Sequence, residues 1–258
     1  MSTAAPHGAE VVIGADHPAL TGRTGLGISV GIIDSGVHPT HPHVGGLAGG
    51  IAIEDDGSLH GDVLDRLGHG TAVTAAIHEK APRAELYIIR VFHGSLSTNI
   101  EALIQALDWA IDRGMRLVNL SLGTANPENA KPLAEAVARA AAAGVTIVSA
   151  RADGSRIWFP GSLPGVVGVE LDWDAPRDQV RIELSGANIL ARASGYPRPI
   201  PGVPPERNLK GVSFAVANTT GLLARFLEGR SGSPVADELL GVSRISEPRA
   251  PEPGPTRR

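Results

Sequence analysis

The 258-residue chain contains no cysteine, which excludes disulfide bonds, thiol catalysis and cysteine-based zinc sites. Aromatic residues amount to only 3%, so a core has to be built from Ala, Val, Ile and Leu. No stretch reaches the roughly 18 consecutive apolar residues that a membrane helix needs. The beginning of the chain also lacks a basic segment followed by an apolar run, the pattern of a secretory signal. We therefore expect a cytoplasmic protein that does not contact a membrane.

The chain also has only a small net charge. Its net charge is −4 and its pI is about 6.1, which gives no electrostatic basis for binding nucleic acid. Hydrophobic residues make up 42% and charged residues 19%, a composition typical of a folded globular chain. The length suits one large domain with a sizeable core.

Short apolar runs alternate with stretches of helical periodicity over most of the chain. The runs predict strands at residues 28–33, 85–92, 117–122, 145–150 and 166–169. The periodic stretches predict helices at residues 71–78, 99–113, 132–143 and 213–227. Strands that alternate with helices imply an α/β fold, in which a mostly parallel central sheet is covered by helices on both faces in three layers.

The regular pattern is lost in two places. Residues 171–210 are interrupted by a group of prolines, which argue for irregular loops and short strands, at Pro197, Pro199, Pro201, Pro204 and Pro205. Beyond Glu228 the chain consists mainly of Gly, Ser, Pro, Arg and Glu, so we expect residues 229–258 to form a disordered tail. Residues 1–24 are interpreted as an N-terminal extension, and residues 25–228 as the single main domain.

Three short strings carry residues of one catalytic chemistry, in a fixed order. They are Asp34-Ser35-Gly36, Gly68-His69-Gly70-Thr71 and Gly211-Val212-Ser213-Phe214-Ala215. A serine hydroxyl is a weak nucleophile until an imidazole removes its proton, and a carboxylate fixes the tautomer of that imidazole and stabilises its positive form. Asp34, His69 and Ser213 therefore suggest a catalytic triad.

Each of the three residues also has an ordinary structural interpretation. Asp34 fits a turn, His69 fits a surface or capping position, and Ser213 fits a helix N-cap, where serine is favoured. Three unrelated structural roles would not be expected to place Asp, His and Ser in the order of a known catalytic triad. This order also excludes an α/β-hydrolase, whose triad follows the order Ser, Asp, His.

On these strings the chain resembles the catalytic domain of the subtilisin-like serine proteases, over about residues 25–228. Three further matches support the resemblance: His41-Pro42, the string Ala81-Pro82-Arg83-Ala84-Glu85-Leu86-Tyr87, and Val118-Asn119-Leu120-Ser121-Leu122-Gly123. The resemblance implies the three-layer subtilisin-like fold. It also implies that Ser213 attacks the scissile carbonyl, that His69 acts as general base and then general acid, and that Asp34 orients His69.

The resemblance further implies where an extended peptide substrate binds. The family's edge segment, which pairs with the backbone of the substrate, is resembled here by Ser121, Leu122 and Gly123. Such pairing depends little on the side chains of the substrate. Ala150 and Ala152 lie in a segment that lines the substrate pocket in the family. A peptide or protein in extended conformation is the expected partner.

Three departures from the family pattern bear on activity. Asp153 stands where the family supplies an asparagine amide to the oxyanion hole, and a carboxylate repels an oxyanion unless it is protonated. Val212 and Phe214 replace the usual Thr and Met around the serine. Only about 25 residues precede the main domain, so the long inhibitory propeptide of secreted relatives is missing from this sequence.

Two other clusters have weaker chemical meaning. His38, His41 and His43 lie close together, and imidazoles bind zinc or nickel, although the family motif already accounts for His41-Pro42. Glu54, Asp55 and Asp56 form an acidic run without the spaced oxygen ligands of a calcium site, so a solvated loop is the simpler interpretation. We expect neither a metal nor a cofactor.

The sequence thus predicts a cytoplasmic serine endopeptidase that works through an acyl-enzyme and performs limited processing of a peptide or leader sequence. Maturation proteases that remove leaders from modified ribosomal peptides are similar, as is the subtilisin-like protease that matures the small subunit of quinohemoprotein amine dehydrogenase. Proteins of such a maturation pathway would be its partners. The alternative is a pseudoprotease that binds peptides while Asp153 suppresses the chemistry.

Overall fold

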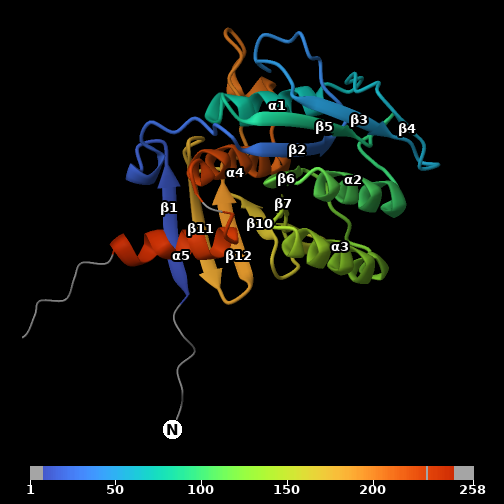
Figure 1. Ribbon diagram of the computed structural model, residues 1–258. Coiled ribbons are helices and arrows are strands. Elements are labelled where there is room, and N and C mark those ends of the chain that lie inside the picture. The colour runs from blue at the N-terminus through green and yellow to red at the C-terminus, as the bar shows by residue number, and fades with distance from the viewer. Residues whose placement is uncertain (1–7, 231, 247–258) are drawn as a thin grey trace, which may run out of the picture.

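The computed structural model describes residues 8–230 and 232–246. Its main feature is a ten-stranded sheet in the order β1-β11-β12-β10-β7-β6-β2-β5-β3-β4 (Figure 1). The strands are β1 (Ala9–Gly14), β2 (Ser29–Asp34), β3 (Gly49–Ile53), β4 (Leu59–His60), β5 (Glu85–Arg90), β6 (Leu117–Leu120), β7 (Thr146–Ala150), β10 (Val167–Leu171), β11 (Gln179–Ser185) and β12 (Asn188–Ala193). The seven neighbouring strands β12-β10-β7-β6-β2-β5-β3 pair in parallel. Antiparallel pairs add β11 and β1 at one edge of the sheet and β4 at the other.

Helices cover both faces of this sheet. The helices are α1 (His69–Lys80), α2 (Ile100–Asp112), α3 (Ala130–Ala142), α4 (Val212–Leu227) and α5 (Val235–Ser246), with short 3-10 turns at Pro18–Leu20, Pro127–Asn129 and Pro205–Arg207. One core cluster joins the sheet to α1, α4 and α5, and a second joins it to α2 and α3. The predicted three-layer α/β fold with a mostly parallel sheet is confirmed.

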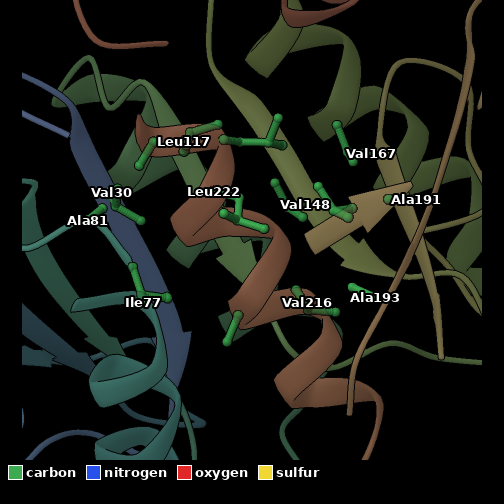
Figure 2. Packing of buried hydrophobic residues seen from close by; sticks show 14 of the residues in the cluster. Val30, Ile77, Ala81, Leu117, Val148, Val167, Ala191, Ala193, Val216 and Leu222 are labelled. Atoms are coloured by element: carbon green, nitrogen blue, oxygen red, sulfur yellow. The ribbon is translucent and has the colours of Figure 1, made fainter. Parts of the chain in front are cut away.

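Helix α4 is the most deeply buried helix of its layer. Its residues from Phe214 to Ala224 are all buried, including the polar Asn218, Thr219 and Thr220. Figure 2 shows Val216 and Leu222 of α4 among side chains of the sheet and of α1. Thr219 Oγ1 donates to the Ala215 carbonyl at 2.8 Å, and Asn218 Nδ2 donates to the Ser194 carbonyl at 2.8 Å, while Asn218 Oδ1 has no partner among the described residues. The Asn218 bond connects α4 to the segment that follows β12.

The structure corrects the expected disorder of residues 229–258 in part. Residues 235–246 form α5, which packs Val235, Leu239 and Val242 against the core. These three residues recur at helical spacing, so one face of the segment is apolar despite its polar composition. Residues 231 and 247–258 lie outside the described part of the chain.

Two further expectations about the ends of the sheet need revision. Residues 171–210 were expected to hold irregular loops and short strands; they contain a regular hairpin, β11–β12, because Val180, Ile182 and Leu184 alternate inward and a turn lies at Gly186. The N-terminal extension supplies β1, an edge strand that buries Val11 and Ile13 against the sheet.

The C-terminal end of α4 is hydrogen-bonded to the segment before β2. The carboxylate of Glu228 accepts hydrogen bonds from the backbone N–H groups of Thr24, Gly25 and Leu26. Arg23 in turn donates to the carbonyls of Phe226 and Glu228. The backbone donors lower the pKa of Glu228. This contact connects the two ends of the expected main domain.

Candidate active site

Asp34 and His69 meet at the C-terminal edge of the parallel strands. Asp34 is the last residue of β2, and His69 is the first residue of α1. The Nδ1 atom of His69 lies 2.7 Å from Oδ1 of Asp34, which also accepts the backbone N–H of Ser35 at 2.7 Å. Asp34 is fully buried, and the side chain of His69 is 15% exposed. The imidazole is thus oriented by a carboxylate that water does not reach.

The charge of Asp34 sets the protonation of this imidazole. Burial acts to lower the pKa of His69, but the hydrogen bond and the charge of Asp34, together with the charge of Asp65, act in the opposite direction. The net result is a pKa of His69 raised above its ordinary value of 6.5. A base of this kind takes up a proton readily near neutral pH.

The backbones of the two segments come too close for any side chain between them. A Cβ atom at Gly70 would lie 2.2 Å from the carbonyl oxygen of Gly36 and 3.1 Å from Oδ1 of Asp34. Gly36 itself has a φ of 105°, a conformation that favours glycine. The glycines of the two strings are therefore required for the contact between Asp34 and His69.

Asp65 holds the first turn of α1 in place and was not singled out from the sequence. Its Oδ1 accepts from Ser35 Oγ at 2.9 Å and from the N–H groups of Leu67 and Gly68, and its Oδ2 accepts from the N–H and hydroxyl of Thr71. Burial acts to raise the pKa of Asp65, but these hydrogen bonds outweigh it and lower the pKa. An aspartate three residues before Gly68, at the start of a helix, was the signal available in the sequence.

Ser213 is the second residue of α4, so it lies among the N–H groups that have no acceptor within the helix. Its Oγ donates to the carbonyl oxygen of Ser121 over 3.3 Å. Within the described residues, this hydroxyl makes no hydrogen bond to His69. The ring centroid of the next residue, Phe214, lies 5.8 Å from that of His69. The first turn of α4 therefore lies near the ring of His69.

The expected substrate-pairing segment lies directly beside Ser213. Ser121 follows β6, and its carbonyl is the acceptor for the Ser213 hydroxyl. The Leu122 carbonyl accepts from Ser149 Oγ at 3.3 Å. Gly123 packs so closely on Trp158 that a Cβ atom there would lie 3.0 Å from the indole ring. This contact limits the space next to the segment.

The two alanines predicted to line the substrate pocket have different surroundings. Ala152 lines a cavity of about 750 Å³ together with Gly211, Val212 and Ser213. Ala150 is the last residue of β7 and is fully buried in the core, so its side chain lies below the surface that a substrate would meet.

Asp153 lies at the edge of the same cavity. It ends the two-residue strand β8 (Ala152–Asp153), which pairs with β9 (Arg156–Ile157), and its neighbours Ala152 and Gly154 line the cavity with Ser213. The side chain of Asp153 lies outside the described part of the structure. The Nε atom of Arg151 lies 3.6 Å from Oε1 of Glu170.

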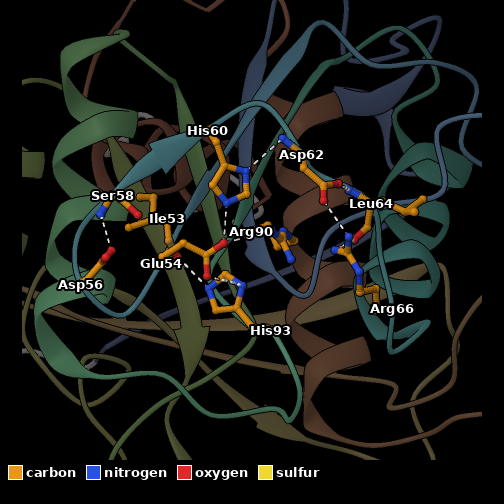
Figure 3. Close-up of polar contacts among 10 residues, drawn as sticks. All are labelled: Ile53, Glu54, Asp56, Ser58, His60, Asp62, Leu64, Arg66, Arg90 and His93. Carbon is orange, nitrogen blue, oxygen red and sulfur yellow. Dashed lines mark hydrogen bonds and ion pairs between the residues drawn. The ribbon is translucent and has the colours of Figure 1, made fainter.

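A second polar cluster surrounds Glu54, which follows β3. Figure 3 shows Glu54 between two histidines: it contacts His60 Nε2, lies 3.2 Å from His93 Nδ1, and lies 3.3 Å from the guanidinium of buried Arg90. Arg90 is the register partner of Asp34 in the neighbouring strand. The cluster thus joins the β3–β4 hairpin to the strand beside Asp34.

The described residues contain no group of three or more His, Cys, Asp or Glu side chains placed to hold a metal ion. The rings of His41 and His43 lie 5.1 Å apart and meet edge to face. No described helix is long and apolar enough to cross a lipid bilayer.

Known proteins share both the sequence pattern and the fold. The subtilase family model matches residues 25–172. Subtilisin DY of Bacillus licheniformis is 28% identical over 233 residues, which cover 84% of this chain and 82% of that protein. Subtilisin Savinase of Lederbergia lenta is 30% identical over 220 residues, covering 81% and 76%. An alkaline protease of Alkalihalobacillus alcalophilus is also 30% identical over 220 residues, but the match spans 54% of its length.

Two solved structures are similar over most of the chain. A cold adapted subtilisin-like serine proteinase has a TM-score of 0.64 at 24% identity, covering 85% of this chain and 82% of that one, and supports the fold. The prenylagaramide maturation protease PagA has a TM-score of 0.62 at 25% identity, covering 84% and 85%.

The sheet order, the helical layers and these similarities define a subtilisin-like serine endopeptidase. The chain belongs to the subtilase family. The resemblance inferred from the motifs is confirmed.

Proposed function

We propose that Asp34, His69 and Ser213 form the catalytic triad of an endopeptidase that performs limited processing of a peptide or leader sequence. The observation that carries the proposal is the 2.7 Å contact between His69 Nδ1 and buried Asp34 Oδ1, with Ser213 on the adjoining helix turn. The proposed catalytic domain comprises residues 25–228. The proposed location of the protein is the cytoplasm.

The contact with Asp34 fixes which nitrogen of His69 does the chemistry. Because Nδ1–H donates to the carboxylate, Nε2 carries the free lone pair and accepts the Ser213 proton. The Ser213 hydroxyl leaves its bond to the Ser121 carbonyl, attacks the scissile carbonyl carbon, and transfers its proton to Nε2. Asp34 then stabilises the positive imidazolium.

The oxyanion that forms lies at the start of α4. The backbone N–H groups of the first turn and the helix dipole both favour negative charge there. When the tetrahedral intermediate collapses, the C–N bond breaks and imidazolium Nε2–H protonates the leaving amine. Water then attacks the acyl-serine while His69 takes its proton, the ester C–O bond breaks, and His69 returns the proton to Ser213 Oγ as the carboxylic product leaves.

A processing role is supported by the likeness to a maturation protease and by the restricted surroundings of the substrate segment. PagA is described as a prenylagaramide maturation protease. In this chain Trp158 packs against Gly123, and Ala150 is buried, so the site offers limited room beside the Ser121–Gly123 backbone. Partner proteins of a peptide-maturation pathway belong to the same proposal.

Digestion of denatured casein tests the processing role. At equal active-site concentrations, this enzyme is expected to give a few persistent fragments, while subtilisin Savinase gives short peptides. The Ser213→Ala variant serves as the control for contaminating protease. Complete digestion by this enzyme at a Savinase-like rate would contradict limited processing. Fragments would be identified by mass spectrometry.

Asp153→Asn is expected to raise kcat by about 10²–10³-fold, because it replaces a carboxylate at the proposed oxyanion position with an amide donor. The control is Asp174→Asn, which removes a charge from an exposed turn. Steady-state hydrolysis of one peptide amide by the three proteins provides the measurement. An unchanged kcat in Asp153→Asn would remove this residue from the oxyanion hole.

A further inference from the structure

The chemistry of a triad fixes on which side of Ser213 each half of the substrate lies. The acyl half stays on Ser213, next to the Ser121–Gly123 segment. The leaving amine takes its proton from His69, so the residues after the scissile bond lie toward His69 and the first turn of α1. The surface on that side decides which leaving segment is accepted.

A cavity of about 180 Å³ lies beside the first turns of α1. One wall is α1, through Gly68, Thr71 and Ala72, which flank His69 in the sequence. The opposite wall is the proline-rich loop between β12 and α4, which rises above α1 in Figure 1. We infer that this cavity binds the residue that follows the scissile bond and selects an acidic one; the inference rests on the proposed function.

The charged groups of the cavity are cationic or neutral. Its lining includes Arg198, His41 and His43, and none of the described residues that line it is acidic. Arg198 Nη1 donates to the backbone carbonyl of His43 at 3.3 Å, which leaves the rest of the guanidinium for a ligand. A carboxylate that enters here meets a positive charge partly removed from water.

Arg198 is the fixed positive charge of the cavity, and it acts on the titration of His43. Burial, then the charges of Arg198 and His41, act to lower the pKa of His43, and Glu79 acts weakly against them. Glu79 itself is engaged by Arg177 and by Lys80 Nζ at 3.2 Å. The His41 Nδ1 accepts the N–H of His43, so neutral His41 carries its proton on Nε2 and can donate there.

The apolar part of the cavity fits a side chain with methylene groups before its carboxylate. Ile200 and Leu209 line it and are 45% and 48% exposed. These two residues come from the same loop as Arg198 and lie on the solvent side. Glutamate, with two methylenes below its charge, matches both surfaces better than lysine or a purely apolar residue.

Acyl transfer measures this selectivity without the natural substrate. An acyl-enzyme is formed from a p-nitrophenyl peptide ester, and glutamate amide, glutamine amide or lysine amide is added as the attacking amine. By microscopic reversibility the amine takes the place of the leaving group. We expect the ratio of aminolysis to hydrolysis to be about tenfold higher for glutamate amide than for glutamine amide, and lowest for lysine amide.

Arg198→Gln is expected to abolish the preference for glutamate amide, and Arg198→Glu to reverse it in favour of lysine amide. The matched control is Arg207→Glu, the same charge change at an exposed position of the same loop that does not line the cavity. Circular dichroism and thermal melting establish that each variant is folded, and Arg198→Gln adds no new charge to the loop.

The outcomes separate the two proposals. An enzyme that acylates but partitions equally among the three amides overturns the cavity assignment and leaves the triad intact. Unchanged selectivity in both Arg198 variants has the same meaning. A folded wild-type protein that forms no acyl-enzyme from any ester overturns the proposed function and the inference together.

Discussion

Ser213→Ala is expected to lower kcat for peptide hydrolysis by about 10⁶-fold, the scale seen for loss of the same serine in subtilisin. In the proposed mechanism this hydroxyl forms the acyl-enzyme, and no other hydroxyl lies in the first turn of α4. The substitution removes only a hydrogen bond to the Ser121 carbonyl at 3.3 Å, so the fold is expected to persist. Purified wild type and variant would be compared under single-turnover conditions.

A serine-directed fluorophosphonate gives an independent readout of the same site. Intact-mass analysis is expected to show one adduct on wild type and none on Ser213→Ala. The matched control is Ser185→Ala, because Ser185 is an exposed serine at the end of β11. That variant, if folded, still labels. Absence of labelling in folded wild type across pH 5–9 would support the peptide-binding module instead.

The motifs allowed much of the site to be predicted because each depends on local geometry. Asp34 ends a buried apolar run, and the Gly-rich strings permit the close approach of two backbones at Gly70. The family resemblance then supplied the roles. Each of these strings can be identified from a few consecutive residues.

The rest of the site depends on contacts between distant segments. Arg198 and His43 are 155 positions apart, and the cavity between them arises only when the proline-rich loop folds over α1. Trp158 reaches Gly123 in the same way. Nothing in the local pattern around either residue indicates a partner, so the cavity walls could not be predicted.

Helix α5 was missed for a different reason. Its apolar residues Val235, Leu239 and Val242 have helical spacing, but Gly, Ser and Pro precede them and Pro, Arg and Glu follow. Average composition over the tail therefore hid an amphipathic segment that buries one face. Periodicity over 12 residues was the better guide there than composition.

Asp34→Asn is expected to lower kcat by about 10⁴-fold while leaving the site close to its present shape. The amide oxygen still accepts from Ser35 N–H and His69 Nδ1–H, but the negative charge that stabilises the imidazolium is gone. Burial continues to lower the pKa of His69 while the contribution of the Asp34 charge is lost, so this pKa falls from its raised wild-type position. A general base works only when neutral, so the acid limb of kcat/KM against pH shifts to lower pH.

The direction of that shift distinguishes loss of charge from a damaged fold. Misfolding lowers activity at every pH, whereas loss of the Asp34 charge moves the acid limb, because wild-type activity falls as pH drops through the raised pKa of His69. Asp62→Asn is the control, since Asp62 pairs with Arg66 in the exposed loop before Asp65. The Asp62→Asn variant is expected to keep the wild-type kcat and the wild-type acid limb of kcat/KM against pH. If the residual activity of Asp34→Asn kept the wild-type acid limb, Asp34 would not be the residue that sets the protonation of His69, and the proposed triad would lose its carboxylate.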